Sequence, residues 1–188
     1  MDDAGDVRAY RKGDMRGFHR LYTRYDRRVF FYIRSMVRDE HLAEDLFQDV
    51  WLQVARKLGG FAFRGEFRNW LFTIAHHRVI DHQRQAKLQQ TVYLDEPVAG
   101  ERDMTYQDVI ADPAPDIIRQ LTTRELYGKV RAVVGLLPAP QRETFLLRVD
   151  AGLKFREIAA MLRVPLNTVL GRMHYAVTAI RTQLKDEL

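Results

Sequence analysis

The chain has 188 residues, of which 46% are hydrophobic and 29% charged, enough for one domain or two small packed ones. It contains no cysteine, which excludes disulfide bridges and thiolate metal sites. No apolar run approaches the roughly 20 residues of a membrane-spanning helix, and the acidic first residues do not resemble a secretory signal. A cytoplasmic protein without membrane insertion is therefore expected.

The formal net charge of +5 is distributed unevenly along the chain. Residues 1–85 carry 16 Lys and Arg against 12 Asp and Glu, residues 86–120 carry 3 against 7, and residues 121–188 carry 11 against 6. Two basic blocks that flank an acidic connector are typical of two nucleic-acid-facing modules held on a linker. The expected domains are residues 1–87 and 119–188, joined by a flexible acidic linker at residues 88–118.

The first block is predicted to form three long helices. Apolar residues at spacings of three and four predict a first helix that Asp14 caps and that continues to Met36. The second helix begins after the polar joint at residues 38–40 and ends at Gly59-Gly60, since glycine often follows the last periodic residue. The third helix runs from near Glu66 to about Lys87.

The third helix divides into two arcs on a helical wheel. One arc must be buried and contains Phe67, Trp70, Leu71, Ile74 and Ala75. The opposite arc is interpreted as a mixed solvent face in which two apolar residues lack a partner. It contains Asn69, Phe72, Thr73, His76, Ile80 and Arg84.

The last third of the chain has the pattern of a DNA-binding motif. Helical periodicity returns after Ile117 and leads, past prolines at 138 and 140, into a helix over residues 144–149. A short helix at residues 155–162 follows, then a break at Val164-Pro165, then a long final helix. Two helices joined by a tight turn are typical of the helix-turn-helix motif, which reads the major groove. No strand pattern is found, so the expected fold is all-α.

Three segments together resemble the bacterial sigma-70 factors of RNA polymerase, and the two-domain layout is similar to their extracytoplasmic-function group. Residues 44–51 resemble the acidic, glutamine-containing stretch of that family, residues 67–82 its promoter-melting helix, and residues 137–183 its terminal helix-turn-helix. The resemblance implies a transcription initiation factor, not an enzyme. Such a factor binds core RNA polymerase, reads and melts the minus-ten promoter element, and reads the minus-thirty-five element.

The resemblance places the polymerase-binding residues on the second helix. They match positions that dock on the clamp helices of the largest polymerase subunit, and they are Glu44, Asp45, Gln48 and Asp49. Carboxylates four residues apart, such as Asp45 and Asp49, lie on one helix face and can pair with cations of a partner helix. The alternative is a solvated acidic face without a partner.

The minus-ten contacts are expected on the loop before the third helix and on that helix itself. An opening protein needs a pocket for the extruded base, aromatic surface for unstacked bases and cations for the backbone. The candidates are Phe61, Phe63, Arg64, Arg68, Asn69, His76, His77 and Arg84. The two phenylalanines could instead cover the domain core. Thr73 and His77 depart from the arginine and asparagine common in the family, so the preferred bases can differ.

The minus-thirty-five contacts are expected on the final helix, which is less basic than is usual in the family. The candidates are Thr168, Leu170, Gly171, Arg172, His174 and Tyr175. Apolar residues such as Leu136, Leu146 and Leu147 are expected to build mostly the core of this domain, and some could instead dock on the polymerase flap.

The acidic linker either threads the RNA channel of the polymerase or is a soluble tether.

The expected partners are core RNA polymerase, through its clamp helices and flap, promoter DNA and an anti-sigma factor, and the free protein is expected to be a monomer. One alternative is a helix-turn-helix repressor that binds operator DNA as a dimer without polymerase. An enzyme is disfavoured because no catalytic motif is present. On a helix, His76, His77 and His82 point in different directions and cannot share a metal. No cofactor and no metal are expected.

Overall fold

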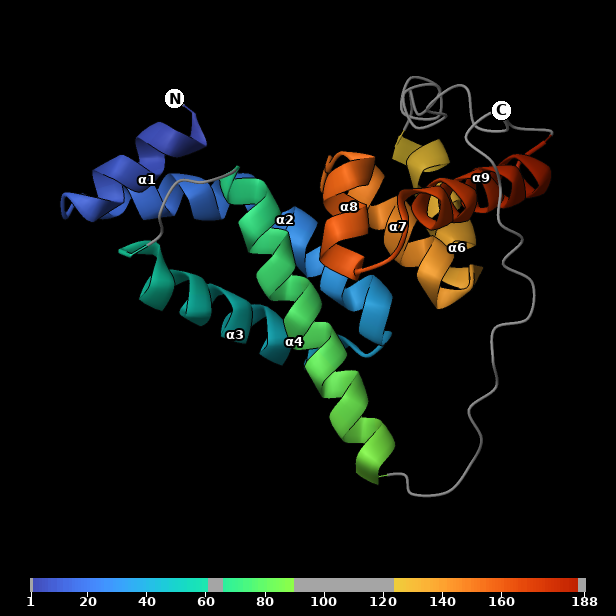
Figure 1. Ribbon diagram of the computed structural model, residues 1–188, viewed down its shortest axis with the longest axis horizontal. Coiled ribbons are helices and arrows are strands. Elements are labelled where there is room, and N and C mark those ends of the chain that lie inside the picture. Colours follow the sequence, from blue (N-terminus) through green and yellow to red (C-terminus); the bar gives the residue numbers. More distant parts are fainter. Residues whose placement is uncertain (1, 61–65, 90–123, 186–188) are drawn as a thin grey trace. The chain divides into compact units, whose positions relative to one another are not determined.

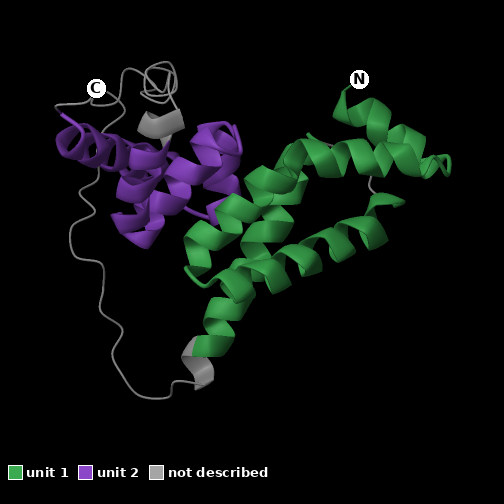
Figure 2. Ribbon diagram, turned by 180° about the vertical axis from the view of Figure 1, so that it is seen from behind, with its two compact units in different colours: residues 1–94 green, residues 95–188 purple. Residues whose placement is uncertain are grey.

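The computed structural model describes residues 2–60, 66–89 and 124–185 (Figure 1). Every regular element within these residues is an α-helix, as the sequence predicted. The chain divides into two compact units, residues 1–94 and 95–188 (Figure 2). The predicted acidic linker at residues 88–118 lies outside the described part of the chain, except for its first two residues, which end α4.

Unit 1 contains α1 (Asp3–Arg11), α2 (Met15–Val37), α3 (Glu40–Leu58) and α4 (Phe67–Gln89) (Figure 1). The last three confirm the three predicted helices. Asp14 caps α2 by accepting a hydrogen bond from the Arg16 backbone N–H at 3.1 Å. Asp39 caps α3 in the same way, through the Leu42 N–H at 2.9 Å.

Helix α1 was not predicted, because its nine residues lack an apolar period. It packs directly against α2. The contact is close enough that a Cβ on Gly17 would lie 2.3 Å from the Asp6 carbonyl oxygen, so glycine is required there. Val7 of α1 is fully buried in this contact.

Helix α4 is buried on two sides, which corrects the predicted solvent face. It packs against both α2 and α3. Phe72, expected to face solvent, is fully buried and meets Tyr32 edge-on with ring centroids 5.8 Å apart. His76 of the same arc is only 9% exposed. A helix enclosed by two neighbours keeps only a narrow solvent face, and the wheel could not show the second neighbour.

Unit 2 contains α6 (Arg124–Leu136), α7 (Ala139–Val149), α8 (Phe155–Leu162) and α9 (Leu166–Gln183) (Figure 1). Helix α8 has the bounds that the sequence predicted. The break before α9 is made by Arg163, which has a left-handed backbone with φ 56°, and by Pro165 at the N-cap of α9. Helices α8 and α9 pack together as a helix-turn-helix.

Two arginines hold the turns that orient this motif. Arg142 is 4% exposed and donates to the carbonyl oxygens of Gly135 and Leu137, each at 3.2 Å. Arg148 donates to the Leu153 carbonyl at 3.0 Å and lies over the Phe155 ring, 5.1 Å from its centroid. Carbonyls at the end of α6 and in the turn before α8 are thereby satisfied.

The apolar residues expected in the core of unit 2 separate into two groups. Leu146 and Leu147 are buried, at 1% and 0% exposure. Leu136 is 81% exposed at the last position of α6, so the expectation that it builds the core is wrong.

Candidate functional site

The four residues predicted to bind polymerase share one exposed face of α3. We call Glu44, Asp45, Gln48 and Asp49 the α3 stripe; all four side chains are exposed. The opposite face of α3 is buried, because Leu46, Val50 and Val54 face the core of unit 1. The stripe therefore follows directly from the amphipathic period of the helix.

The α3 stripe carries unneutralised charge and continues into an apolar residue. Within residues 2–60, 66–89 and 124–185, none of its three carboxylates forms a salt bridge. Leu52 lies one turn beyond Gln48 and Asp49 and is 54% exposed. An acidic surface with an exposed leucine at one end suits a partner that offers both cations and apolar surface.

A groove of about 400 Å³ lies between α3 and α4, and we call it the α3–α4 groove. The side chains that line it combine an aromatic ring, cations, hydrogen-bonding groups and one carboxylate. They are Gln53, Lys57, Trp70, Thr73, Ile74, His77, Arg78 and Asp81. Among the residues predicted for the minus-ten element that the structure describes, only His77 lines this groove, and it is exposed.

The chemistry of the α3–α4 groove suits an unstacked nucleobase with its phosphate. Trp70 is half-buried and offers ring surface, and Lys57 is an exposed cation. The buried Nε of Arg78 has no hydrogen-bond partner among the described residues, so it is a donor still to be satisfied. The Thr73 hydroxyl donates to the Asn69 carbonyl at 2.8 Å and is therefore occupied.

Sequence reasoning missed Lys57, Arg78 and Trp70 as site residues, and Trp70, which was expected to be buried, is half-buried instead. Lys57 belongs to α3, which the sequence assigned to polymerase docking alone, and the groove exists only where α3 packs on α4. The signal available in the sequence was the placement of two cations: Lys57 lies near the end of α3, and Arg78 lies in the middle of α4.

The other minus-ten candidates have different environments. Arg68 is bound to Glu66 at 2.5 Å, Asn69 is half-buried, and Arg84 is exposed. Phe61, Phe63 and Arg64 lie outside the described residues. His76 is buried, with its ring 5.6 Å from that of His77, so its expected place on a DNA-facing surface is wrong. The packing of α4 against two neighbours explains its burial.

The six candidates on α9 also include both accessible and buried residues. His174 and Tyr175 are exposed and their rings lie 5.8 Å apart, and Thr168 and Arg172 are half-buried. Leu170, 8% exposed, and Gly171 are buried, so their expected exposure to DNA is wrong. Both are among the buried residues of α9, which packs on α6, α7 and α8.

Comparison with known proteins identifies both units. Residues 21–89 match sigma-70 region 2, and residues 127–180 match sigma-70 region 4. The ECF RNA polymerase sigma factor SigW of Bacillus subtilis is 29% identical over 183 residues, which cover 96% of this chain and 95% of the relative. SigK of Mycobacterium tuberculosis, another ECF RNA polymerase sigma factor, is 27% identical and covers 91% and 87%. The chain belongs to the extracytoplasmic-function group of the sigma-70 family.

Two solved structures share the fold of this sigma factor. The structure of CnrH in complex with the cytosolic domain of CnrY has a TM-score of 0.62 at 21% identity and covers 99% of both chains. The sigma factor RpoE of Bartonella quintana, solved in complex with the anti-sigma factor NepR, also has a TM-score of 0.62, at 19% identity, over 91% of this chain and 98% of that one.

Membership of this family decides between the alternatives left by the sequence. A sigma factor is an initiation factor that works with RNA polymerase at promoters, so the chain is neither an enzyme nor a stand-alone repressor.

No helix in the described residues is long and apolar enough to span a bilayer. The region 2 match begins at Leu21, so α1 and the first six residues of α2 precede it.

Proposed function

We propose that this sigma factor docks on core RNA polymerase through the α3 stripe. Four exposed polar side chains lie on one face, and three of them are carboxylates that form no salt bridge with another described residue, so they can pair with cations on the clamp helices. Leu52 adds apolar area at one end of the same face. In unit 2, the exposed Leu136 offers a comparable apolar contact for the polymerase flap.

We propose that the α3–α4 groove holds a base extruded from the minus-ten element. The observation that carries this proposal is the groove of about 400 Å³ in which Trp70, His77, Lys57 and Arg78 converge from two helices. Stacking on an aromatic side chain is worth about 1–3 kcal/mol per base, comparable with the cost of unstacking it. His77 supplies hydrogen bonds to the base edge, and the two cations offset the phosphate charge.

Beside the groove, Arg68, Asn69 and Arg84 follow the opened strand, and the loop with Phe61, Phe63 and Arg64 stays a prediction. We leave His76 out of the contacting set because it is buried. In unit 2, α9 contacts the minus-thirty-five element through Thr168, Arg172, His174 and Tyr175. Leu170 and Gly171 support the helix from inside.

We also infer that the free protein is a cytoplasmic monomer held inactive by an anti-sigma factor. The support is the fold shared with two chains, CnrH and RpoE, solved in complex with CnrY and with the anti-sigma factor NepR. Core polymerase and promoter DNA, the other two partners, are intracellular.

Run-off transcription with purified core polymerase tests the groove directly. Trp70→Ala and His77→Ala should each reduce transcription from a duplex promoter while core binding is unchanged. His82→Ala is the matched control, because His82 lies on the same helix but does not line the groove. Equal transcription by Trp70→Ala, His77→Ala and His82→Ala would contradict the proposal.

A further inference from the structure

Helix α1 lies outside the segment that matches sigma-70 region 2, yet it is joined tightly to that segment. Asp6 of α1 is fully buried and accepts from Arg20 Nε at 2.5 Å and from Arg24 at 2.9 Å. Burial alone would raise the pKa of Asp6, but hydrogen bonds from the two arginines outweigh it and hold the pKa below its usual value. The carboxylate is therefore ionised at neutral pH and fixes α1 on α2.

A continuous line of contacts leads from α1 to the α3–α4 groove. Asp3 of α1 binds Arg24 and accepts a hydrogen bond from the Tyr25 hydroxyl at 2.5 Å. The Tyr25 ring lies against Phe67, the first residue of α4, with centroids 5.7 Å apart. Phe67 in turn lies against Trp70, with centroids 5.8 Å apart.

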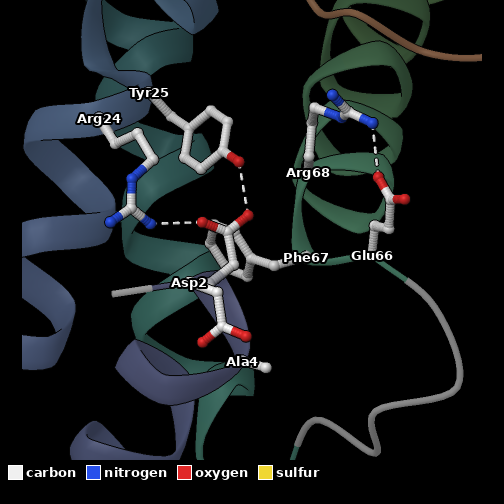
Figure 3. Close-up of a pocket in the computed structure, with 8 residues that line it drawn as sticks. Asp2, Ala4, Arg24, Tyr25, Glu66, Phe67 and Arg68 are labelled. Atoms are coloured by element: carbon white, nitrogen blue, oxygen red, sulfur yellow. Dashed lines mark hydrogen bonds and ion pairs between the residues drawn. The ribbon is translucent and has the colours of Figure 1, made fainter.

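Figure 3 shows the first half of this line: Arg24 and Tyr25 converge on one carboxylate, and Phe67 lies beside it. Burial raises the pKa of the Tyr25 hydroxyl, and the hydrogen bond to Asp3 raises it further, so the hydroxyl remains a donor. Phe67 is fully buried and Tyr25 is 5% exposed, so both rings have defined positions. Trp70, at the other end, is half-buried and lines the groove.

A cavity of about 400 Å³ lies along this line of contacts, between α1, α2 and the start of α4 (Figure 3). Asp3, Tyr25, Phe67 and Arg68 are among the residues that line it. On the side that faces the cavity, no packed neighbour opposes a movement of the Tyr25 ring. The hydrogen bond from Tyr25 to Asp3 restrains the ring on that side.

We propose that α1 is a positioning element for the α3–α4 groove: Asp3, acting through Tyr25 and Phe67, sets the orientation of Trp70. This inference rests on the proposed role of the groove. It assigns a role in promoter opening to a helix outside the matched region 2. Asp3 and Tyr25 are positioning residues, since neither lines the groove itself.

The test begins with a spectroscopic signature of Trp70. The chain has two tryptophans, and a Trp51→Phe background leaves Trp70 as the single fluorophore. In that background, Tyr25→Phe and Asp3→Ala should each raise the acrylamide quenching constant of Trp70 at least about twofold. Arg8→Ala, an exposed position on the same helix, should leave it unchanged. Unchanged quenching in both Tyr25→Phe and Asp3→Ala would overturn the inference.

The functional arm uses the full chain with core polymerase and a duplex promoter. Removal of one hydrogen bond corresponds to a change of about fivefold in an equilibrium or rate constant, so Tyr25→Phe and Asp3→Ala should each slow promoter opening by about that factor. In a Trp70→Ala background the same changes should have no further effect, because residues acting through one side chain are not additive. A loss of core binding equal to the loss of opening, or full additivity, would indicate a merely structural role and contradict the proposal.

This design separates the two proposals. If Trp70→Ala opens promoters like the wild type, the proposed function of the groove fails. If Trp70→Ala is defective while Tyr25→Phe and Asp3→Ala are not, the groove stands and only the role of α1 fails.

Discussion

Helices α4 and α9, the two helices proposed to contact DNA, are built differently. Helix α4 packs against α2 and α3. Its proposed DNA-contacting residues Trp70, His77 and Arg78 line a groove together with Lys57 of α3. Helix α9 also packs on its neighbours, α6, α7 and α8, but within the described residues its proposed contacts form no groove with another helix and include one cation, Arg172. We infer that unit 1 supplies most of the base recognition and that unit 2 adds a weaker contact with duplex DNA.

The largest expected effect concerns the enclosure of α4. Phe72 is fully buried against Tyr32, so Phe72→Ala should destabilise unit 1 by about 3–5 kcal/mol. The matched change on α9, Tyr175→Ala, removes a ring that is 37% exposed and should change stability by no more than about 0.5 kcal/mol. Urea unfolding followed by circular dichroism measures both. Similar losses of stability in the two variants would contradict the claim that Phe72 of α4 is packed in the core and Tyr175 of α9 is not.

The next effect separates docking from DNA contact within unit 1. Asp45→Arg reverses a charge on the α3 stripe and should weaken binding to core polymerase by about tenfold or more, or about 1.4 kcal/mol. His41→Ala, an exposed change on the same helix outside the stripe, is the control. Fluorescence anisotropy with labelled sigma factor and core polymerase measures both affinities, and an unchanged Asp45→Arg affinity would remove the docking assignment.

A smaller effect is expected on α9. Arg172→Ala should weaken promoter use while polymerase binding stays intact. If Arg172 contacts a phosphate, the slope of log affinity against log salt concentration should also become shallower by about 1. Filter binding of the polymerase–sigma complex to promoter DNA at several salt concentrations gives this slope. Equal loss of promoter use and of polymerase binding would refute the role of Arg172.

The smallest effect appears only in acid. Because the pKa of Asp6 is lower in the folded protein than its usual 3.8, its contribution to stability is complete above the unfolded value and is lost as the pH falls through the folded value. Urea unfolding between about pH 6 and pH 2 should therefore show a loss of stability at the acid end. In the Asp6→Asn variant, the free energy of unfolding should depend less on pH at the acid end. Identical profiles for the two proteins would show that Asp6 is not the titrating group.

The sequence predicted most of the fold because its helices carry clear local signals. Asp14 was expected to cap α2, residues 155–162 were expected to form a helix, and both are observed. Helix α1 was missed because Asp3, Asp6 and the glycine at position 17 hold it, and none of these gives an apolar period.

The site was predicted less completely, for reasons of packing. The α3 stripe depends on one helix and its period, so its exposure could be foreseen. The α3–α4 groove depends on two helices, so Lys57, Trp70 and Arg78 were missed as site residues. His76 and Leu170 were misplaced because a sequence shows which face of a helix is apolar but not how many neighbours cover it.

The central claim is that the α3–α4 groove takes a base out of the minus-ten duplex. Promoters with 2-aminopurine substituted at single minus-ten positions report unstacking by a rise in fluorescence when polymerase and sigma factor bind. We predict that one position shows a rise that Trp70→Ala and His77→Ala both diminish and His82→Ala does not. A fluorescence rise that is the same for the wild type and all three variants at every position would contradict the claim.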